Sequence, residues 1–139
     1  MELYEIKVKY TRQNGEDNPT NVKETYLVEG ISPSSVEQQL LEEIKPLISG
    51  ECEVTSIRKR VFYDIINKQT NDICNFYECK VELIAIEDNG SEKRKGVAIL
   101  LEAENINDAV RLLNASLGNL DCEIVGIKKS QIIDFYRAV

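Results

Sequence analysis

The sequence predicts an α+β fold of two tandem ββαβ repeats packed as one pseudo-twofold domain, with six main strands and two helices. Three observations support it: colinear self-similarity, strand-like alternation of apolar and polar residues, and two helical apolar stripes with capping residues. The first repeat is expected at 1–66, a linker at 67–75 and the second repeat at 76–139. A repeat of about 60 residues has little core of its own, so we expect the copies to pack together.

The strands carry the clearest repetition. The pattern YEIKV at residues 4–8 returns as YECKV at 77–81, and residues 52–59 correspond in the same way to residues 122–129. Apolar residues alternate with charged ones in the first pair of segments, which is typical of half-buried strands. The tails at 62–66 and 132–136 are also similar to each other. Asn14-Gly15 and Asn89-Gly90 follow the first strand of each copy and favour type I′ hairpins.

Capping residues indicate where both helices begin and end. Ser32 and Pro33 are typical of an N-cap and first helical position, and Pro46 should end this helix near Lys45. Its expected apolar stripe is Val36, Leu40, Leu41, Ile44 and Ile48. In the second copy, Asn105 or Asn107 is the expected N-cap and Gly118 the terminator. That stripe is expected to contain Ile106, Ala109, Val110, Leu113 and Leu117.

Composition excludes several classes of enzyme. The 139 residues carry 17 basic and 24 acidic side chains, for a net charge of −7, and contain no histidine. Catalysis by Ser-His-Asp or Cys-His groups is therefore excluded, as is zinc held by histidine. Neither a P-loop nor a GxGxxG motif is present, so a nucleotide-hydrolysing enzyme is not expected. The first residues do not have the pattern of a signal peptide and no apolar run is long enough to cross a bilayer, so we expect a cytoplasmic protein.

Cysteines and paired carboxylates suggest little chemistry. The spacing of Cys52, Cys74, Cys79 and Cys122 is not that of a Cys₄ zinc site, and we expect reduced, structural thiols. Glu29 with Glu102 and Asp64 with Asp134 are related by the repeat. A metal-dependent enzyme built on the Asp pair is the least favoured hypothesis, because a turn or cap role suits these aspartates better. No cofactor, metal site or catalytic residue is expected.

Basic residues gather where the repeat places strand faces and strand ends. Aligned, they would form a cationic groove suited to a nucleic-acid strand; these residues are Lys7, Lys9, Arg58, Arg60, Lys80 and Lys128. Alternatively, such residues only protect exposed sheet edges from aggregation. Because acidic residues outnumber basic ones, nucleic-acid binding is the alternative hypothesis and a protein partner of unknown identity is the first. A homodimer formed through a strand edge is also compatible with this scaffold.

Several segments resemble one known family. These are residues 4–10, 24–28, 48–54 and 57–60, together with the second half from residue 76 onward. Their pattern is similar to that of the domain of unknown function 4494 family, over nearly the whole chain. The resemblance implies an origin in gut Bacteroidetes-type bacteria or their phages and assigns no binding or catalytic residue. We therefore expect a small, non-enzymatic accessory protein, associated with a phage or mobile element, that binds another protein.

Overall fold

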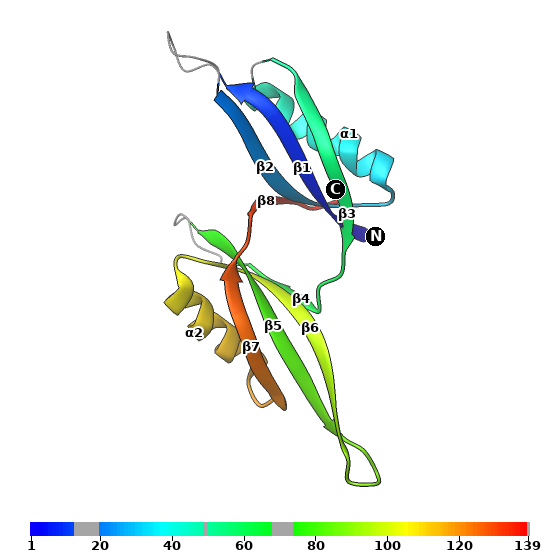
Figure 1. Cartoon of the computed structure of the whole chain (residues 1–139), viewed down its shortest axis with the longest axis vertical. Helices are drawn as coiled ribbons and strands as arrows, with labels where there is room; N and C mark the ends of the chain where they lie inside the picture. Colours follow the sequence, from blue (N-terminus) through cyan, green and yellow to red (C-terminus); the bar gives the residue numbers. More distant parts are fainter. Residues whose placement is uncertain (13–19, 49, 68–73, 139) are drawn as a thin grey trace. The chain divides into compact units, whose positions relative to one another are not determined.

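The computed structural model describes residues 1–12, 20–48, 50–67 and 74–138. Over these residues the chain forms eight strands, two α-helices and one 3₁₀ helix (Figure 1). In chain order they are β1 (Glu2–Arg12), β2 (Thr20–Gly30), α1 (Pro33–Ile44), η1 (Lys45–Leu47), β3 (Cys52–Arg60), β4 (Asp64–Ile66), β5 (Asn75–Ile86), β6 (Glu92–Ala103), α2 (Ile106–Leu117), β7 (Cys122–Lys129) and β8 (Ile132–Tyr136). The α+β class is confirmed, but the described residues form two mixed four-stranded sheets, with eight strands where six main strands were expected.

The chain divides into two compact units. Unit 1 contains Met1–Val61 and Gln131–Val139, and unit 2 contains Phe62–Ser130. The strand order is β3-β1-β2-β8 in the sheet of unit 1 and β4-β6-β5-β7 in that of unit 2. These limits differ from the expected repeat limits, because the last segment of each expected repeat joins the sheet formed by the other half of the chain. Most of the expected linker, residues 68–73, lies outside the described residues.

Two short strands complete the sheets. β8 pairs in parallel with β2, with Tyr26 opposite Asp134 and Val28 opposite Tyr136. β4 pairs in parallel with β6, from Asp64 opposite Ile99 to Ile66 opposite Leu101. The two tails are similar in sequence, but this similarity by itself predicts no place for them in a sheet. A hairpin pattern in a sequence predicts pairing only between strands that follow each other in the chain. β4 and β8 pair with strands far from them in the sequence, so no hairpin pattern predicts these pairs.

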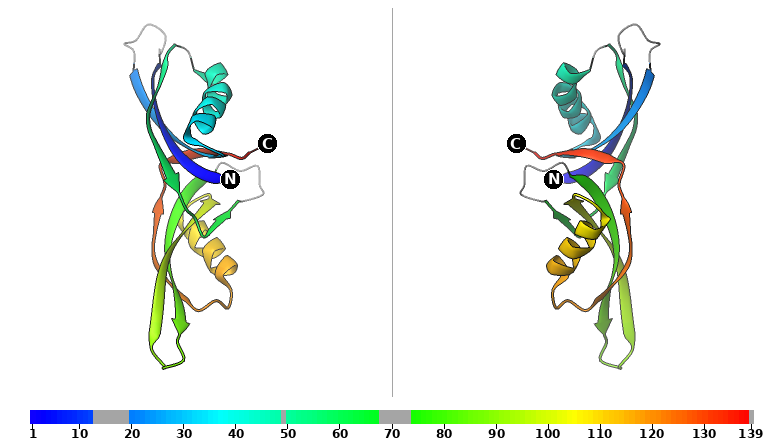
Figure 2. Two further views of the ribbon diagram at one scale, coloured as in Figure 1. Left: turned by 90° about the vertical axis from the view of Figure 1, so that its right-hand side faces the viewer. Right: turned by 90° about the vertical axis from the view of Figure 1, so that its left-hand side faces the viewer.

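In unit 1, α1 covers one face of the sheet (Figure 2). The buried core combines Ile6, Val8 and Val28 from the strands with Val36, Leu40 and Ile44 from the helix. As expected, the Ser32 hydroxyl accepts the amide hydrogen of Ser35 at 3.2 Å, Pro33 begins the helix, and the chain tightens into a 3₁₀ turn around Pro46. A side chain at Gly30 would collide with Val36, so β2 can approach the helix this closely only with glycine.

Unit 2 has a similar core, on which α2 packs. Its fully buried side chains include Cys79 on β5, Leu101 on β6 and Leu113 on α2. The Asn105 side chain accepts the amide hydrogen of Asp108 at 2.9 Å, and Gly118 ends the helix with φ +54, both as expected. The expected apolar stripe is too wide, however. Ile106 and Val110 are 50% and 40% exposed, because the sheet covers only the side of the helix that carries Ala109 and Leu113.

The β5–β6 hairpin differs from the expected type I′ turn. The Gly90 amide donates to the Glu87 carbonyl at 2.9 Å, and the Glu87 amide donates to the Ser91 carbonyl at the same distance. Gly90 has φ +83, and only glycines have positive φ among the described residues. A type I′ turn needs positive φ at two consecutive central residues, so Asn89 does not meet this requirement. The other expected turn, at Asn14-Gly15, lies outside the described residues.

Candidate ligand-binding groove

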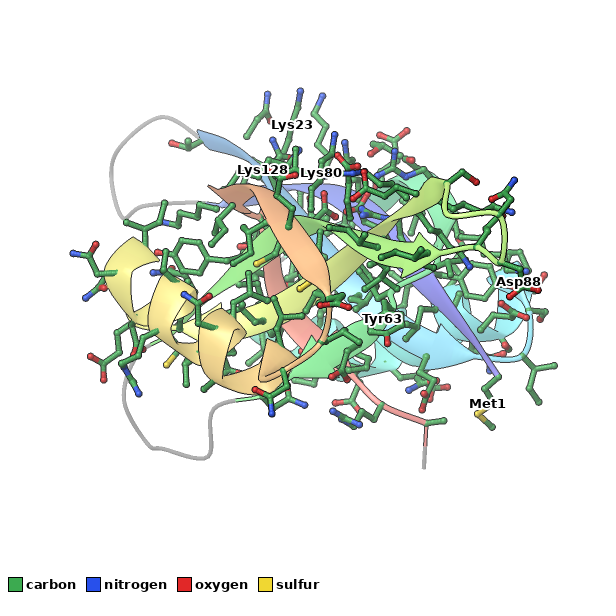
Figure 3. The ribbon with its side chains drawn as sticks, turned by 90° about the horizontal axis from the view of Figure 1, so that it is seen from below. Met1, Lys23, Tyr63, Lys80, Asp88 and Lys128 are labelled. Carbon is green, nitrogen blue, oxygen red and sulfur yellow. The ribbon has the colours of Figure 1, made fainter. Side chains whose placement is uncertain are left out.

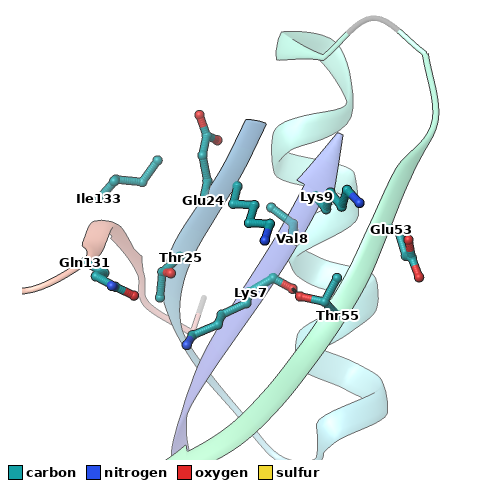
Figure 4. A pocket seen from close by; sticks show the side chains of 10 residues that line it. Lys7, Val8, Lys9, Glu24, Thr25, Glu53, Thr55, Gln131 and Ile133 are labelled. Carbon is teal, nitrogen blue, oxygen red and sulfur yellow. Dashed lines mark hydrogen bonds between the residues drawn. The ribbon is translucent and has the colours of Figure 1, made fainter. Parts of the chain in front are cut away.

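A groove with a volume of about 770 Å³ lies on the sheet of unit 1, on the face away from α1 (Figure 4). Three adjacent strands, β1, β2 and β3, form its floor, and Gln131 before β8 and Ile133 within β8 contribute to its wall. The lining residues are Lys7, Val8, Lys9, Lys23, Glu24, Thr25, Glu53, Thr55, Gln131 and Ile133. All of them belong to unit 1.

Strand alternation places three lysines on this face. On β1, Ile6 and Val8 point into the core beneath α1, so Lys7 and Lys9 point to the opposite side. Antiparallel pairing then sets Lys23 of β2 directly opposite Lys9. Lys7 and Lys23 are exposed, and Lys9 is half-buried. We call Lys7, Lys9 and Lys23 the lysine triad.

The lysine triad lacks neutralising partners within the described part of the chain. No described carboxylate forms an ion pair within 4.0 Å with any of the three ammonium groups, although Glu53 lies opposite Lys9 on β3. Like charges directly opposite each other on neighbouring strands are destabilising, which applies to Lys9 and Lys23. The groove face therefore holds three cations beside one carboxylate, that of Glu53.

The corresponding face of unit 2 has different charges. β1 shows one register shift in its pairing with β3, between Lys7 and Val8. β5 shows a corresponding shift in its pairing with β7, between Lys80 and Val81. Counted from these shifts, Glu82 takes the place of Lys9. Gly96, opposite Glu82, takes the place of Lys23. A sheet with this pairing pattern therefore forms without lysines at these two positions.

Glu82 is also neutralised locally. Arg94 on β6 lies 3.8 Å from Glu82 and 3.4 Å from Glu92, and it also pairs with Glu123 on β7. Glu123 and Glu92 raise the pKa of Arg94, mainly through its hydrogen bond with Glu123. On the outer face of unit 2, Arg94 thus joins three carboxylates in one ion-pair cluster, whereas unit 1 presents three lysines on its groove face.

The two arginines predicted to bind nucleic acid are engaged inside unit 1. Arg58 Nη2 lies 2.8 Å from Glu5 Oε2, and Arg60 Nη1 lies 3.1 Å from Glu5 Oε1. Glu5 is only 8% exposed, so this ion-pair network is part of the folded sheet. Arg58 and Arg60 are poorly suited to a ligand site, because a ligand phosphate would compete with a buried carboxylate.

The other predicted cations fall into two places. Lys7 and Lys9 line the groove, whereas Lys80 and Lys128 belong to unit 2, where Figure 3 labels both. The Lys128 ammonium lies 3.9 Å from Glu78, and Lys80 is exposed between Ala98 and Gly126. Lys23 was missed by the sequence analysis. Its place in the groove follows from its pairing with Lys9, which no pattern within β2 indicates.

Other polar groups of the two units form local hydrogen bonds. Glu24, one of the lining residues, accepts hydrogen bonds from the hydroxyls of Tyr10 at 2.8 Å and Tyr26 at 2.6 Å. Burial, and then the hydrogen bond with Glu24, raise the pKa of Tyr26 well above its ordinary value. Asp64 on β4 and Asp134 on β8 each accept the amide hydrogen of the next residue, at 2.8 and 2.9 Å. Both lie in strands, whereas a turn or cap role was expected for them.

Burial keeps the thiols of Cys79 and Cys52 protonated at neutral pH. Cys79 is fully buried, and this burial raises its pKa to about 11. Burial also raises the pKa of Cys52. Neither thiol is activated as a nucleophile, because the thiolate is the reactive form. Within the described ranges, no group of three or more Cys, Asp or Glu side chains is arranged to hold a metal ion.

Comparison with known protein families shows to which family the chain belongs. The sequence model of a domain of unknown function, DUF4494, matches residues 2–138. The chain belongs to this family. The match covers both units and confirms the resemblance seen in the sequence. No curated protein and no solved structure matches the chain. Of the helices described, none has the length and apolar character needed to cross a membrane.

Proposed function

We propose that this member of the DUF4494 family is a small, non-enzymatic accessory protein that binds a protein partner through the groove of unit 1. The lysine triad carries the proposal. Its three cations share one face of a sheet whose counterpart in unit 2 has glutamate and glycine at two of the three positions. Lysines that form no ion pair, at positions where the fold does not require lysine, are typical of a surface that binds an oppositely charged ligand.

A protein partner suits the groove better than a nucleic acid does. Proteins that bind single strands on a sheet usually stack bases on aromatic side chains, and the residues that line this groove are not aromatic. Glu53, which lies opposite Lys9 on the groove face, is acidic and would repel a continuous phosphate backbone. The net charge of −7 also opposes non-specific attraction to nucleic acid.

Nucleic-acid binding is the second candidate function, and one observation favours it. Lys7 and Lys9, two of the cations first assigned to this role, lie together in the groove and are joined there by Lys23. Lysine binds phosphate well as a point charge. In this version the ligand contacts the lysine triad, and Arg58 and Arg60 take no part because they hold Glu5.

We also propose a setting for this function. Similar segments, helix caps at corresponding places and matching register shifts support the inference that the two units are copies of one ββαβ repeat. We place the protein in the cytoplasm of a bacterium that carries the phage or mobile element encoding it. A homodimer formed through a strand edge would present two copies of the groove to a partner.

The test is affinity capture with matched variants. The groove variant combines Lys7→Gln, Lys9→Gln and Lys23→Gln; the control variant combines Lys80→Gln, Lys95→Gln and Lys129→Gln in unit 2. Both lose the same charge. We expect host proteins that are retained by the wild type and the control variant, but not by the groove variant, and that resist nuclease treatment. Equal retention by all three chains would contradict a role for the groove. Retention lost on nuclease treatment would favour nucleic acid.

A further inference from the structure

The spacing of the lysine triad defines a pattern of charge. Lys7 and Lys9 are two residues apart on β1, so their Cα atoms are separated by about 6.6–6.8 Å, two strand rises. Lys23 lies across the ladder from Lys9, at a Cα separation of about 4.5–5.5 Å for an antiparallel pair. The triad thus has two cations along the strand direction and a third beside one of them.

An extended peptide presents the complementary pattern. Alternate side chains of a strand-like segment lie on one face, again about 6.6–6.8 Å apart. Acidic residues at alternate positions of a segment that runs along β1 would face Lys7 and Lys9 in register, with Lys23 next to the second acid. Acidic residues that are contiguous in the sequence point to opposite faces of an extended chain, so only every second one would reach the lysines.

The remaining lining residues favour a peptide over a bare polyanion. The Thr55 hydroxyl already donates to the Lys7 carbonyl at 3.2 Å, so it faces the groove with acceptor capacity. Gln131 is exposed and has both donor and acceptor atoms for a peptide backbone. Ile133, 53% exposed, provides an apolar contact that a phosphate backbone would not use.

We infer that the groove binds an extended acidic segment of the partner protein, with carboxylates at alternate positions facing Lys7 and Lys9 and flanked by Lys23. This inference rests on the proposed function and specifies the partner's chemistry. Glu53 on β3 borders the triad on one side, so the acidic face of the segment lies over β1 and β2 and away from β3.

The test measures fluorescence anisotropy of labelled peptides against the full chain. One peptide carries three glutamates at alternate positions in a Gly/Ser/Thr background, a second carries the same residues with the glutamates contiguous, and a third has glutamines in their place. An oligothymidylate of similar length is the fourth probe. We expect the alternating peptide to bind several-fold more tightly than the contiguous one, and the glutamine peptide to bind no better than background.

The variants of the capture experiment provide the charge control. An exposed ion pair contributes roughly 1.4- to 5-fold in affinity, so the groove variant should bind the alternating peptide about tenfold more weakly. The unit 2 control variant should stay within about twofold of the wild type, because none of its three substituted lysines lines the groove. Rising salt should weaken binding of the wild type.

Four results would overturn the inference. Equal affinity for the alternating and contiguous peptides would show that the spacing of the carboxylates along the peptide does not affect binding. Tight binding of oligothymidylate, with no binding of either acidic peptide, would show that the groove binds nucleic acid and not an acidic peptide. A third result is that no peptide binds, while capture of a host protein resists nuclease and still depends on the lysine triad. In that case the groove does not bind an acidic segment, and the proposed function stands. Loss of both signals would reject the two proposals together.

Discussion

Replacing Glu5 by glutamine removes the negative charge on which Arg58 and Arg60 converge. The Glu5 side chain is 10% exposed, and that of Arg60 is 17% exposed, so this half of the network is shielded from water. The Arg58 side chain is 64% exposed, and water screens its ion pair. In the Glu5→Gln variant an amide nitrogen, which can only donate, would face one guanidinium group, and the other arginine would keep only a neutral acceptor.

The expected loss follows from these two contacts. A hydrogen bond to a charged group contributes about 1.5–3 kcal/mol, which we assign to Arg60. An exposed ion pair contributes about 0.2–1 kcal/mol, which we assign to Arg58. Glu5→Gln should therefore lower the free energy of unfolding by about 2–4 kcal/mol.

Urea unfolding followed by far-UV circular dichroism measures this loss, with Glu2→Gln as the matched control. Glu2 lies on the same strand and pairs with Lys59 at 3.1 Å, but the two side chains are 47% and 56% exposed. The control should change the free energy of unfolding by less than about 1 kcal/mol. If both variants unfold within about 0.5 kcal/mol of each other, the range typical of plain surface changes, Glu5 is not a buried ion-pair centre and our reasoning is wrong.

Three further predictions concern the lysine triad, the buried thiol and the last strand. Lys23→Glu should raise the free energy of unfolding by about 0.2–1 kcal/mol, because it replaces a like-charged cross-strand pair with Lys9 by an opposite one; a urea midpoint equal to or below that of the wild type would contradict this. Burial raises the pKa of Cys79 from 9.0 to about 11, so this thiol ionises at a lower pH in the unfolded chain than in the folded one. The free energy of unfolding should therefore fall between about pH 9 and about pH 11, by about 2–3 kcal/mol. Cys79→Val should make the alkaline decrease in urea stability smaller than in the wild type, and an identical pH dependence would refute it. Deleting residues 131–139 removes β8 and the ring of Tyr136 stacked 5.9 Å from Tyr26, so amide exchange in β2 should accelerate; unchanged exchange would show that β8 contributes nothing to this sheet.

Local signals predicted the secondary structure well, because they act within one turn or one strand. Ser32, Asn105 and Gly118 marked helix ends correctly, since a cap satisfies backbone groups only a few residues away. The alternation at residues 4–8 located β1 and its buried face. The breadth of the second helical stripe was overestimated, because periodicity shows which residues are apolar and not how far the opposing sheet extends to cover them.

The candidate site was only partly predictable, because charge clusters depend on register. Lys7 and Lys9 were identified from their own strand, whereas Lys23 joined them only through pairing with β2. The sequence also grouped Arg58 and Arg60 with the free cations. Their partner, Glu5, is more than 50 residues away along the chain, and no local pattern connects the two.

The sequence by itself determined the family, the α+β class, the helix limits and the alternation that separates core from outer face, since these depend on local propensity and on side-chain period. Only the tertiary structure decided that β4 and β8 complete sheets built by the other half of the chain. It also decided which charges are neutralised and which remain available in the groove. Ion pairs form through space, and a strand pair such as Val28 with Tyr136 joins residues about 100 positions apart, beyond the reach of any local pattern.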